Sequence, residues 1–310
     1  MNKTILDTKI KDFFSLHFLR PENVSWDLHV SLLFQKYFFK KNNKYQDTLE
    51  IGSGNGLNTF LNLSGSLKDT YDFFVNINDK KLFKNNDIYN FYNITKSNDI
   101  VKKKVKKKFS LVIDHKKNLL DHSKVLDISE AYLKFDCNKE LPKNRKYDFI
   151  FTTILYWLNS YEKLIDFAKL LKDENSLLVF TVPNENYLNY CQSYKSKSLF
   201  WKMINNRRKE TLQFQINQVL FERWLKQNNF NIFAKHKLLS KSTLSIWDIG
   251  LRVFYKNFIY LLKKLPIQER LIFKNQWMEQ YFSVIKELVE EELHNGPKNG
   301  GYCMYILQKK

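Results

Sequence analysis

Short apolar runs alternate with helical patterns along most of the chain. Such alternation is typical of an α/β domain, in which helices cover a central sheet. Seven runs have the length and composition of buried strands, counting only the first part of the fourth: Leu49–Ile51, Ser110–Asp114, Tyr132–Asp136, Tyr147–Trp157, Ser176–Asn184, Phe230–Leu239 and Tyr302–Leu307. The sequence therefore predicts a seven-stranded sheet sandwiched by helices.

Two further regions are helical. Residues 1–46 predict a helical arm, in which Pro21 opens a helix and apolar residues follow at near-helical spacing. Near the end of the chain, Ile246–Leu265 and Ile267–Leu293 are two helical patterns divided by Pro266. The first is apolar on most sides, so we expect it to be buried or to lie against another surface. Peripheral contact with a membrane stays open, because lysines flank its aromatic residues.

Three of the chain's eight glycines stand at alternate positions just after the first predicted strand. Gly52, Gly54 and Gly56 follow Glu50 and precede a helical pattern that begins at Leu57. Glycines at such a turn let the backbone approach a ligand closely, and the helix that follows offers free amides. The loop lacks the Gly-Lys-Ser/Thr of a P-loop, and Leu57 replaces the third glycine of the dinucleotide fingerprint. The loop therefore predicts another nucleotide-like cofactor.

The acid-x-Gly-x-Gly-x-Gly loop resembles motif I of the class I S-adenosylmethionine-dependent methyltransferases. The resemblance implies S-adenosyl-L-methionine as cofactor and S-adenosyl-L-homocysteine as product, with the loop (Glu50, Gly52, Ser53, Gly54 and Gly56) beneath the methionine part. It also implies a Rossmann-like sheet in which strand seven runs antiparallel between strands five and six. As a whole, the chain looks like bacterial methyltransferases of the type 11-like group that act on small molecules and surface polysaccharides.

Acidic residues also end the second and third predicted strands, as this family expects. Asp114 is then the acid that binds the two ribose hydroxyls, because a carboxylate accepts two hydrogen bonds from a vicinal diol. Its neighbour His115 would border the cofactor. The resemblance places Asp136 near the adenine amino group, together with Cys137. It places Thr153, after the fourth strand, beside the cofactor as well.

The gap between the glycine loop and Asp114 is longer than this family usually has. Either residues 65–108 are an insertion, or the ribose acid is Asp69 or Asp72. The sequence favours the insertion, because Asp114 follows a better strand and precedes a better helix than the other two acids. Within the insertion, Tyr71–Ile77 could add a strand or a hairpin.

These patterns divide the chain into three parts. The expected parts are a helical N-terminal arm (1–46), a cofactor-binding α/β domain (47–240 and 300–310, with the insertion 65–108), and helices that form a lid or bind the acceptor (183–217 and 241–299). The resemblance implies that the arm and the lid select the acceptor.

The net charge of +19 is high, but its cause is ambiguous. Lysine, asparagine, phenylalanine and tyrosine are all abundant, and these residues have AT-rich codons. The charge by itself is therefore weak evidence for any acceptor, and nucleic acid is a less favoured but still open partner. The run Lys102–Lys108 is either a solvated face or a patch for an anionic surface.

The remaining composition predicts a cytoplasmic protein without a metal. The three cysteines (Cys137, Cys191 and Cys303) have no C-x-x-C spacing, which argues against a disulfide scaffold or a cysteine-based metal site. No apolar run is long enough to span a bilayer, and the first residues lack a signal core. The oligomeric state is not predicted.

Candidate residues for acceptor chemistry are weaker. His29 on the arm and Tyr156 after the fourth strand could contact the transferable methyl group, although a packing role competes for both. Trp157, Tyr187, Arg207 and Arg208 could bind the acceptor. The sequence therefore predicts a methyltransferase for a small molecule, with a sugar or glycan-biosynthesis intermediate methylated on oxygen as the leading acceptor. An RNA or other polyanion methyltransferase, a non-catalytic protein of the same fold and a nicotinamide oxidoreductase remain the alternatives, in that order.

Overall fold

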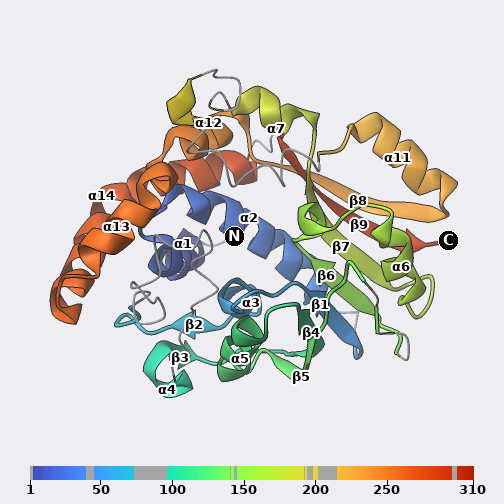
Figure 1. Ribbon diagram of the computed structural model, residues 1–310, viewed down its shortest axis with the longest axis horizontal. Coiled ribbons are helices and arrows are strands. Elements are labelled where there is room, and N and C mark those ends of the chain that lie inside the picture. The colour runs from blue at the N-terminus through green and yellow to red at the C-terminus, as the bar shows by residue number, and fades with distance from the viewer. Residues whose placement is uncertain are drawn as a thin grey trace.

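The computed structural model describes residues 3–39, 45–72, 96–139, 141–142, 145–191, 193, 198–201, 215–294 and 299–310 (Figure 1). Seven strands form one mixed sheet in the spatial order β5-β4-β1-β6-β7-β9-β8. The strands are β1 Thr48–Ile51, β4 Phe109–Asp114, β5 Ser129–Lys134, β6 Phe149–Thr152, β7 Leu177–Pro183, β8 Phe230–Leu238 and β9 Tyr302–Lys309. β9 runs antiparallel between β7 and β8, and the five strands from β5 to β7 are parallel. The predicted fold class, including the antiparallel seventh strand, is confirmed.

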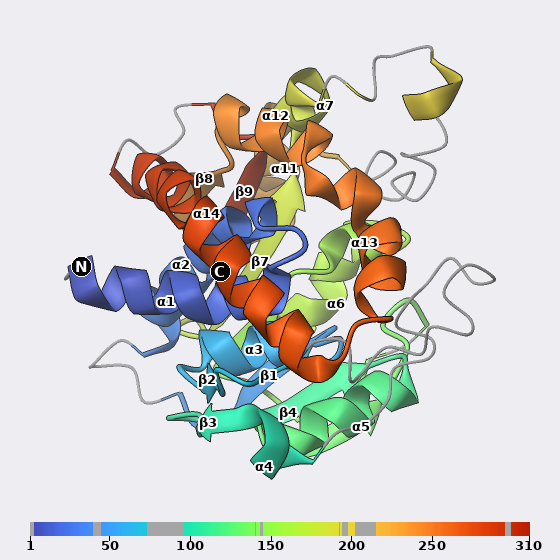
Figure 2. The same ribbon diagram turned by 90° about the vertical axis from the view of Figure 1, so that its left-hand side faces the viewer.

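Helices cover both faces of the sheet (Figures 1 and 2). On one face lie α2 (Glu22–Phe38), α3 (Leu57–Asn62) and α5 (Lys117–Val125), and on the other α6 (Lys163–Lys169) and α11 (Gln218–Gln227). Because of this double cover, every residue of β6 and β7 is buried. Strands buried on both faces are continuous apolar runs rather than alternating ones, which is why the sequence pattern detected them.

The arm packs directly on the sheet through α2. The ring of Phe34 on this helix lies 6.1, 5.9 and 4.7 Å from the rings of Phe109, Phe149 and Phe151, which belong to β4 and β6. α1 (Lys3–His17) and the long α14 (Ile267–His294) both contact α2 on its far side. The predicted helical arm is therefore present, and aromatic packing fixes its position over β4 and β6.

The insertion between α3 and β4 contains a second, two-stranded sheet. β2 (Ser66–Leu67) pairs antiparallel with β3 (Val101–Lys103), and α4 (Ser97–Ile100) precedes β3. Of the predicted strand or hairpin Tyr71–Ile77, only the first two residues are described, and they belong to no strand. The other five lie outside the described residues.

The helical pattern Ile246–Leu265 does not form one helix, so this prediction was wrong. It is divided into α12 (Lys241–Ile249), the 3-10 turn η6 (Leu251–Phe254) and α13 (Tyr255–Leu262). The break lies at Gly250, which has an extended backbone with ψ −166°. A Cβ atom at this position would lie 2.7 Å from the carbonyl oxygen of Ile246 and 3.0 Å from the carboxyl group of Glu22. Close packing against α2 therefore sets the break, and apolar periodicity does not reveal it.

The second pattern, after Pro266, forms α14 as predicted. None of the helices in the described ranges is both long and apolar enough to cross a bilayer.

Side chains of α14 also bind the first part of the insertion. Its Arg270 forms an ion pair with Asp72, with the nearest nitrogen and oxygen 2.5 Å apart, and both side chains are nearly buried. Lys274 donates hydrogen bonds to the carbonyl oxygens of Asp69 and Tyr71 at 2.8 and 2.9 Å. Burial lowers the pKa of Lys274 to about 8. Polar contacts thus help to hold this segment against the long helix, beside the buried ring of Tyr71.

We expect Asp72→Asn to lower the free energy of unfolding by about 3 kcal/mol, because it leaves a nearly buried guanidinium without its carboxylate. Asp69→Asn is the matched control. Asp69 pairs with Lys102 at 3.1 Å, but its side chain is 88% exposed. Its loss should therefore cost less than about 1 kcal/mol. Urea unfolding at neutral pH measures both values, and equal losses would contradict the proposed anchoring.

Candidate functional site

The glycine loop joins β1 to α3 in a left-handed backbone conformation. Gly52, Gly54 and Gly56 have φ values of 79°, 58° and 78°, which residues with side chains rarely adopt. An added Cβ atom would lie 2.4 Å from Ile154 at Gly52 and 2.6 Å from the hydroxyl of Ser123 at Gly56. At Gly54 it would meet nothing within 4 Å. Two of the glycines thus allow the loop to pack, whereas Gly54 borders open space that a ligand can enter.

Asp114 lies beside this loop, at the end of β4. Its Oδ2 accepts a hydrogen bond of 2.9 Å from the amide of Gly54, and its Oδ1 accepts one of 2.9 Å from the amide of Lys116. A carboxylate has about four acceptor positions, so both oxygens can still accept a hydroxyl. The alternatives Asp69 and Asp72 are engaged with Lys102 and Arg270. Of the three acids, Asp114 contacts the glycine loop, and its role as the ribose acid stays a prediction.

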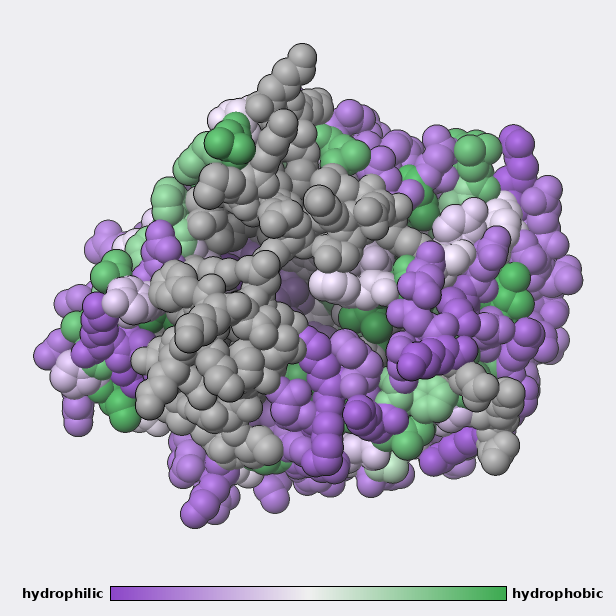
Figure 3. All heavy atoms as spheres, viewed as in Figure 1, coloured by the Kyte–Doolittle hydropathy of each residue, from purple (hydrophilic) through white to green (hydrophobic). Residues whose placement is uncertain are grey.

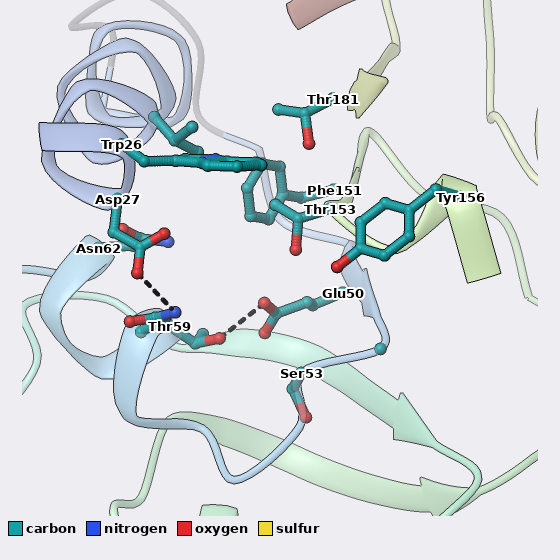
Figure 4. Close-up of a pocket in the computed structure, with 13 residues that line it drawn as sticks. Trp26, Asp27, Glu50, Ser53, Thr59, Asn62, Phe151, Thr153, Tyr156 and Thr181 are labelled. Carbon is teal, nitrogen blue, oxygen red and sulfur yellow. Dashed lines mark hydrogen bonds between the residues drawn. The ribbon is translucent and has the colours of Figure 1, made fainter. Parts of the chain in front are cut away.

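A pocket opens where the carboxyl ends of the central strands meet the arm (Figure 4). Its walls come from α2, from the glycine loop with α3, from the end of β6 with the 3-10 turn η4 (Leu155–Trp157), and from β7. The lining residues are Trp26, Asp27, Val30, Glu50, Gly52, Ser53, Asn58, Thr59, Asn62, Phe151, Thr153, Tyr156 and Thr181. Figure 4 shows Glu50 and Tyr156 pointing into the space from one side and Asp27 from the other.

Glu50 is a buried carboxyl group with one oxygen left unbonded. Its Oε1 accepts a hydrogen bond of 2.6 Å from the hydroxyl of Thr59, while its Oε2 is buried and has no partner among the described residues. Burial raises the pKa of Glu50 to about 8, the bond from Thr59 lowers it, and the charge of Asp114 raises it further. An unpartnered buried carboxyl oxygen is costly, and a cation or a hydrogen-bond donor in the pocket would relieve that cost.

The pocket is acidic in a strongly basic protein. About one residue in six of the chain is Lys or Arg, so thirteen residues taken at random would include about two. The thirteen lining residues include none, nor any histidine, but they do include the carboxyl groups of Asp27 and Glu50. The described lining therefore favours a ligand with positive charge and disfavours a phosphate.

The residues predicted to bind the cofactor fall into two groups. Glu50, Gly52, Ser53 and Thr153 line the pocket. The others lie at the adjoining strand ends, outside the lining: Gly54, Gly56, Asp114, His115, Asp136 and Cys137. The parallel order β5-β4-β1-β6 brings both groups to the same edge of the sheet.

Within the second group, Asp114 and Asp136 have different polar neighbours. His115 is exposed, and its Nδ1 lies 3.3 Å from Oδ1 of Asp114. Asp136 follows β5, and its Oδ1 accepts a hydrogen bond of 3.0 Å from the amide of Asn138. Burial raises the pKa of the Cys137 thiol to about 12, and the charges of Asp136 and Asp114 raise it too. The thiol is therefore neutral at physiological pH and is no nucleophile there.

The candidates for catalysis and acceptor binding are scattered. Tyr156 lines the pocket, whereas His29 is buried against α14, with its Nδ1 3.6 Å from a carboxyl oxygen of Glu292. Tyr187 is fully buried between the rings of Trp247 and Tyr302, 5.9 and 5.4 Å away.

The other acceptor candidates are Trp157, Arg207 and Arg208. Trp157 is 52% exposed, and its ring lies 5.6 Å from that of Tyr156. Arg207 and Arg208 lie outside the described residues. Among the candidates that the structure describes, Tyr156 and Trp157 are thus the two at or beside the pocket.

Sequence reasoning missed Asp27, the second acid of the pocket. Its Oδ2 lies 2.5 Å from Nε2 of His17 and accepts a hydrogen bond of 3.2 Å from Asn58. His17 is buried at the end of α1. Helical spacing predicted the arm helix and its Trp26, but not which face of that helix meets the pocket. That face depends on the packing of α2 on the sheet, for which the sequence holds no local signal.

Elsewhere, no group of three or more histidine, cysteine or acidic residues in the described ranges is placed to hold a metal ion.

Comparisons with known proteins give limited information. No protein-family model matches the sequence, and no curated protein sequence matches it. Among solved structures, the chain is similar to the plantazolicin methyltransferase BpumL in complex with SAH, at 11% identity and a TM-score of 0.47, over 99% of this chain and 96% of that one. It is also similar to YjhP from E. coli, at 10% identity and a TM-score of 0.44, over 93% and 99% of the two chains.

A third similar structure is a SAM-dependent methyltransferase from Thiobacillus denitrificans in complex with S-adenosyl-L-homocysteine. The identity is 8% and the TM-score 0.40, over 85% of each chain. The order β5-β4-β1-β6-β7-β9-β8, with β9 antiparallel, identifies the fold.

Glu50→Gln tests the buried carboxyl group. In the folded protein the pKa of Glu50 is about 8, against an ordinary value of 4.5, so the unfolded chain releases this proton at lower pH. The wild type should therefore lose stability as the pH rises through this range, relative to the variant, by up to about 1.4 kcal/mol per pH unit. The difference between the two free energies of unfolding should not change with pH below about pH 4.5 or above about pH 8.

Urea unfolding at a series of pH values measures this difference. Glu174→Gln, at an exposed turn, is the control and should change nothing with pH. A constant offset between Glu50→Gln and the wild type from pH 5 to pH 8 would contradict the raised pKa.

Proposed function

We propose that the protein transfers the methyl group of S-adenosylmethionine to the oxygen of a small-molecule acceptor. The observation that carries this proposal is the acidic pocket beside the glycine loop, with the unpartnered Oε2 of Glu50 inside it. S-adenosylmethionine has an ammonium group and a sulfonium, both positively charged, and no phosphate. These are the charges that the lining favours, in a chain whose net charge of +19 would otherwise repel them.

The described residues fit this cofactor along the whole edge of the sheet. Oε2 of Glu50 would accept a hydrogen bond from the ammonium group, which would hold the carboxylate in its charged form. Gly54 leaves room for the ligand, Asp114 has acceptor positions left for the ribose hydroxyls, and Asp136 would approach the adenine amino group. The chemistry supplied by the cofactor is a methyl group on a positively charged sulfur, which a nucleophile can take by in-line displacement.

Asp27 supports oxygen as the acceptor atom. A hydroxyl acceptor profits from a base that removes its proton, whereas an amine needs less help. Asp27 is held through Oδ2 by His17 and Asn58, and its Oδ1 has no hydrogen bond from the described residues. This oxygen would take the hydroxyl proton, while the contacts on Oδ2 fix the carboxylate in position. Tyr156 and Trp157, beside the pocket, would bind a sugar ring, so a sugar or a glycan-biosynthesis intermediate is our leading acceptor.

Two alternatives are less well supported by the same pocket. A nicotinamide dinucleotide would bring its negatively charged pyrophosphate beside Asp27 and Glu50. An RNA or other polyanion methyltransferase would need basic residues that lead to the pocket. Lys103 and Lys106 of the lysine-rich run instead line a separate hollow with α1, on the other side of α3. A non-catalytic binding protein would bind the cofactor equally well, and activity alone distinguishes it.

Gly54→Ala tests the cofactor assignment by calorimetric titration. We expect the wild type to bind S-adenosylmethionine and S-adenosylhomocysteine with a Kd on the order of micromolar, and NAD not to bind. The added methyl group would project from the loop into the ligand's space, so binding should weaken at least about tenfold. Stability should fall by only about 1 kcal/mol, the cost of φ 58° at a residue other than glycine, because nothing lies within 4 Å of the new atom.

Asp69→Asn serves as the control in this titration, since its side chain is exposed on the insertion, and it should bind as the wild type does. If the wild type binds neither sulfur ligand, or if Gly54→Ala binds both unchanged, the assignment is wrong.

Asp27→Asn tests the base. Asparagine keeps a hydrogen bond to His17 but cannot take a proton, so methyl transfer should fall about 10²- to 10⁴-fold. The Kd for S-adenosylhomocysteine should change by less than about threefold, because Glu50 is assigned to the ammonium group and this product has no sulfonium charge for Asp27 to attract. Transfer of labelled methyl groups to a panel of sugars and other hydroxyl compounds measures the first quantity, and calorimetry measures the second. An equal loss of both would show that Asp27 holds the cofactor instead.

A further inference from the structure

The segment 246–267 exposes an unusual share of large hydrophobic side chains. Six of the sixteen such residues found exposed in the described part of the chain lie within these twenty-two positions. They are Ile246, Ile249, Phe254, Tyr260, Leu261 and Ile267. In Figure 3, hydrophobic residues recur among hydrophilic ones at the upper left and left, where Figure 1 places α12, α13 and part of α14. This concentration in one segment calls for a cause other than scattered surface exposure.

The inner sides of the same elements are already used by the fold. Leu244 and Trp247 of α12 and Ile259 and Leu262 of α13 are buried in the main core. Tyr255, at the start of α13, lies under the guanidinium of Arg20, with the guanidinium carbon 4.2 Å from the ring centroid. The exposed residues therefore form a second, outward face, which we call the α12–α13 face and define by the six residues named above.

The segment has four basic residues and one acid in its sequence, and of the basic side chains that the structure describes, Lys264 is exposed and Lys263 half-buried. Its only acid is Asp248, which is buried and accepts a hydrogen bond of 2.7 Å from the amide of Ser193. Its basic residues are Arg252, Lys256, Lys263 and Lys264. Nζ of Lys264 lies 4.1 Å from the ring centroid of Tyr260, so that a cation and an aromatic ring share the outer side of α13. The face thus combines apolar side chains with positive charge.

That combination fits an anionic lipid surface better than a second copy of the chain. In a two-fold symmetric dimer, the same patch meets itself, so Lys263 and Lys264 of both copies would lie in one interface, where the segment's one acid, Asp248, is buried and cannot pair with them. An anionic bilayer offers negative headgroups to the lysines and an acyl boundary to Leu261 and Ile249. α13 has eight residues, far too few to span a membrane, but a short amphipathic helix can lie in the interface plane.

We propose that the α12–α13 face docks the protein on anionic lipid bilayers as a peripheral membrane protein. The exposed apolar residues enter the boundary between headgroups and acyl chains, and the lysines bind the headgroups. Trp247, on the inner side of α12, contacts Trp26 of the pocket with ring centroids 5.9 Å apart. Docking therefore leaves the pocket on the protein side of α12. The proposal does not depend on the identity of the cofactor.

Flotation of the full-length protein with vesicles tests this proposal. We expect at least about tenfold more protein on vesicles of phosphatidylcholine with phosphatidylglycerol than on phosphatidylcholine alone, and weaker binding at higher salt. The double variant Ile249→Ser/Leu261→Ser removes apolar contacts, and Lys263→Gln/Lys264→Gln removes two charges. Each should reduce binding to the anionic vesicles about tenfold or more.

Val219→Ser/Leu220→Ser is the matched apolar control, since these α11 residues are 68% and 59% exposed, comparable with 63% and 58% at Ile249 and Leu261. It should bind vesicles as the wild type does. None of these side chains is buried, so each variant should fold, and its thermal transition checks this.

Three results would overturn the proposal. In the first, neither vesicle binds the protein. In the second, Ile249→Ser/Leu261→Ser binds as well as the wild type, which would indicate adsorption of a basic protein by charge alone. In the third, sedimentation shows a dimer that this variant abolishes, which would assign the face to a second copy.

Discussion

The hydrogen bonds of Asp114 fix the loop on which the rest of the site depends. Three left-handed glycines at alternate positions interrupt the regular strand and helix bonds. The amide of Gly52 still donates to the carbonyl oxygen of Ile113 on β4 at 2.8 Å, and side chains supply further contacts. Asp114 binds the amide of Gly54, Ser123 donates to the carbonyl oxygen of the same residue at 3.1 Å, and His122 lies 2.7 Å from that of Asn55. These contacts come from β4 and α5, because β4 lies next to β1 in the sheet. The topology therefore determines the loop, and the loop determines one wall of the pocket.

Glu50 connects this geometry to the charge of the site. The register of the sheet places it between Val112 and Phe151, where burial disfavours a charge. In the protein alone, its carboxyl group is neutral at neutral pH, since its pKa is about 8. A cation that reaches Oε2 would favour the charged form, so ligand binding and proton release are coupled. The pocket lining thus holds two carboxyl groups and no described lysine, arginine or histidine, in a protein that is basic as a whole.

The sheet was predictable from the sequence, whereas the far wall of the pocket was not. Strands β4, β6, β7 and β9 are largely buried apolar runs, and Asp114 could be placed because a strand before it and a helix after it both have clear patterns. Asp27 and its contact with His17, ten positions earlier, depend instead on how α1 and α2 pack. Apolar periodicity predicted one helix across Gly250. The helix ends there because Glu22 of another helix lies close to this residue. Contacts between elements, rather than patterns within them, decided these features.

A crystal structure of the protein with S-adenosylhomocysteine tests the central claim most directly. The claim is that the acidic pocket and the neighbouring strand ends bind one sulfur cofactor. We predict the ligand's ammonium group within hydrogen-bond distance of Oε2 of Glu50, its ribose hydroxyls on Asp114 and its adenine toward Asp136. Clear density for the ligand at any other place, or an empty pocket at a saturating concentration, would contradict it.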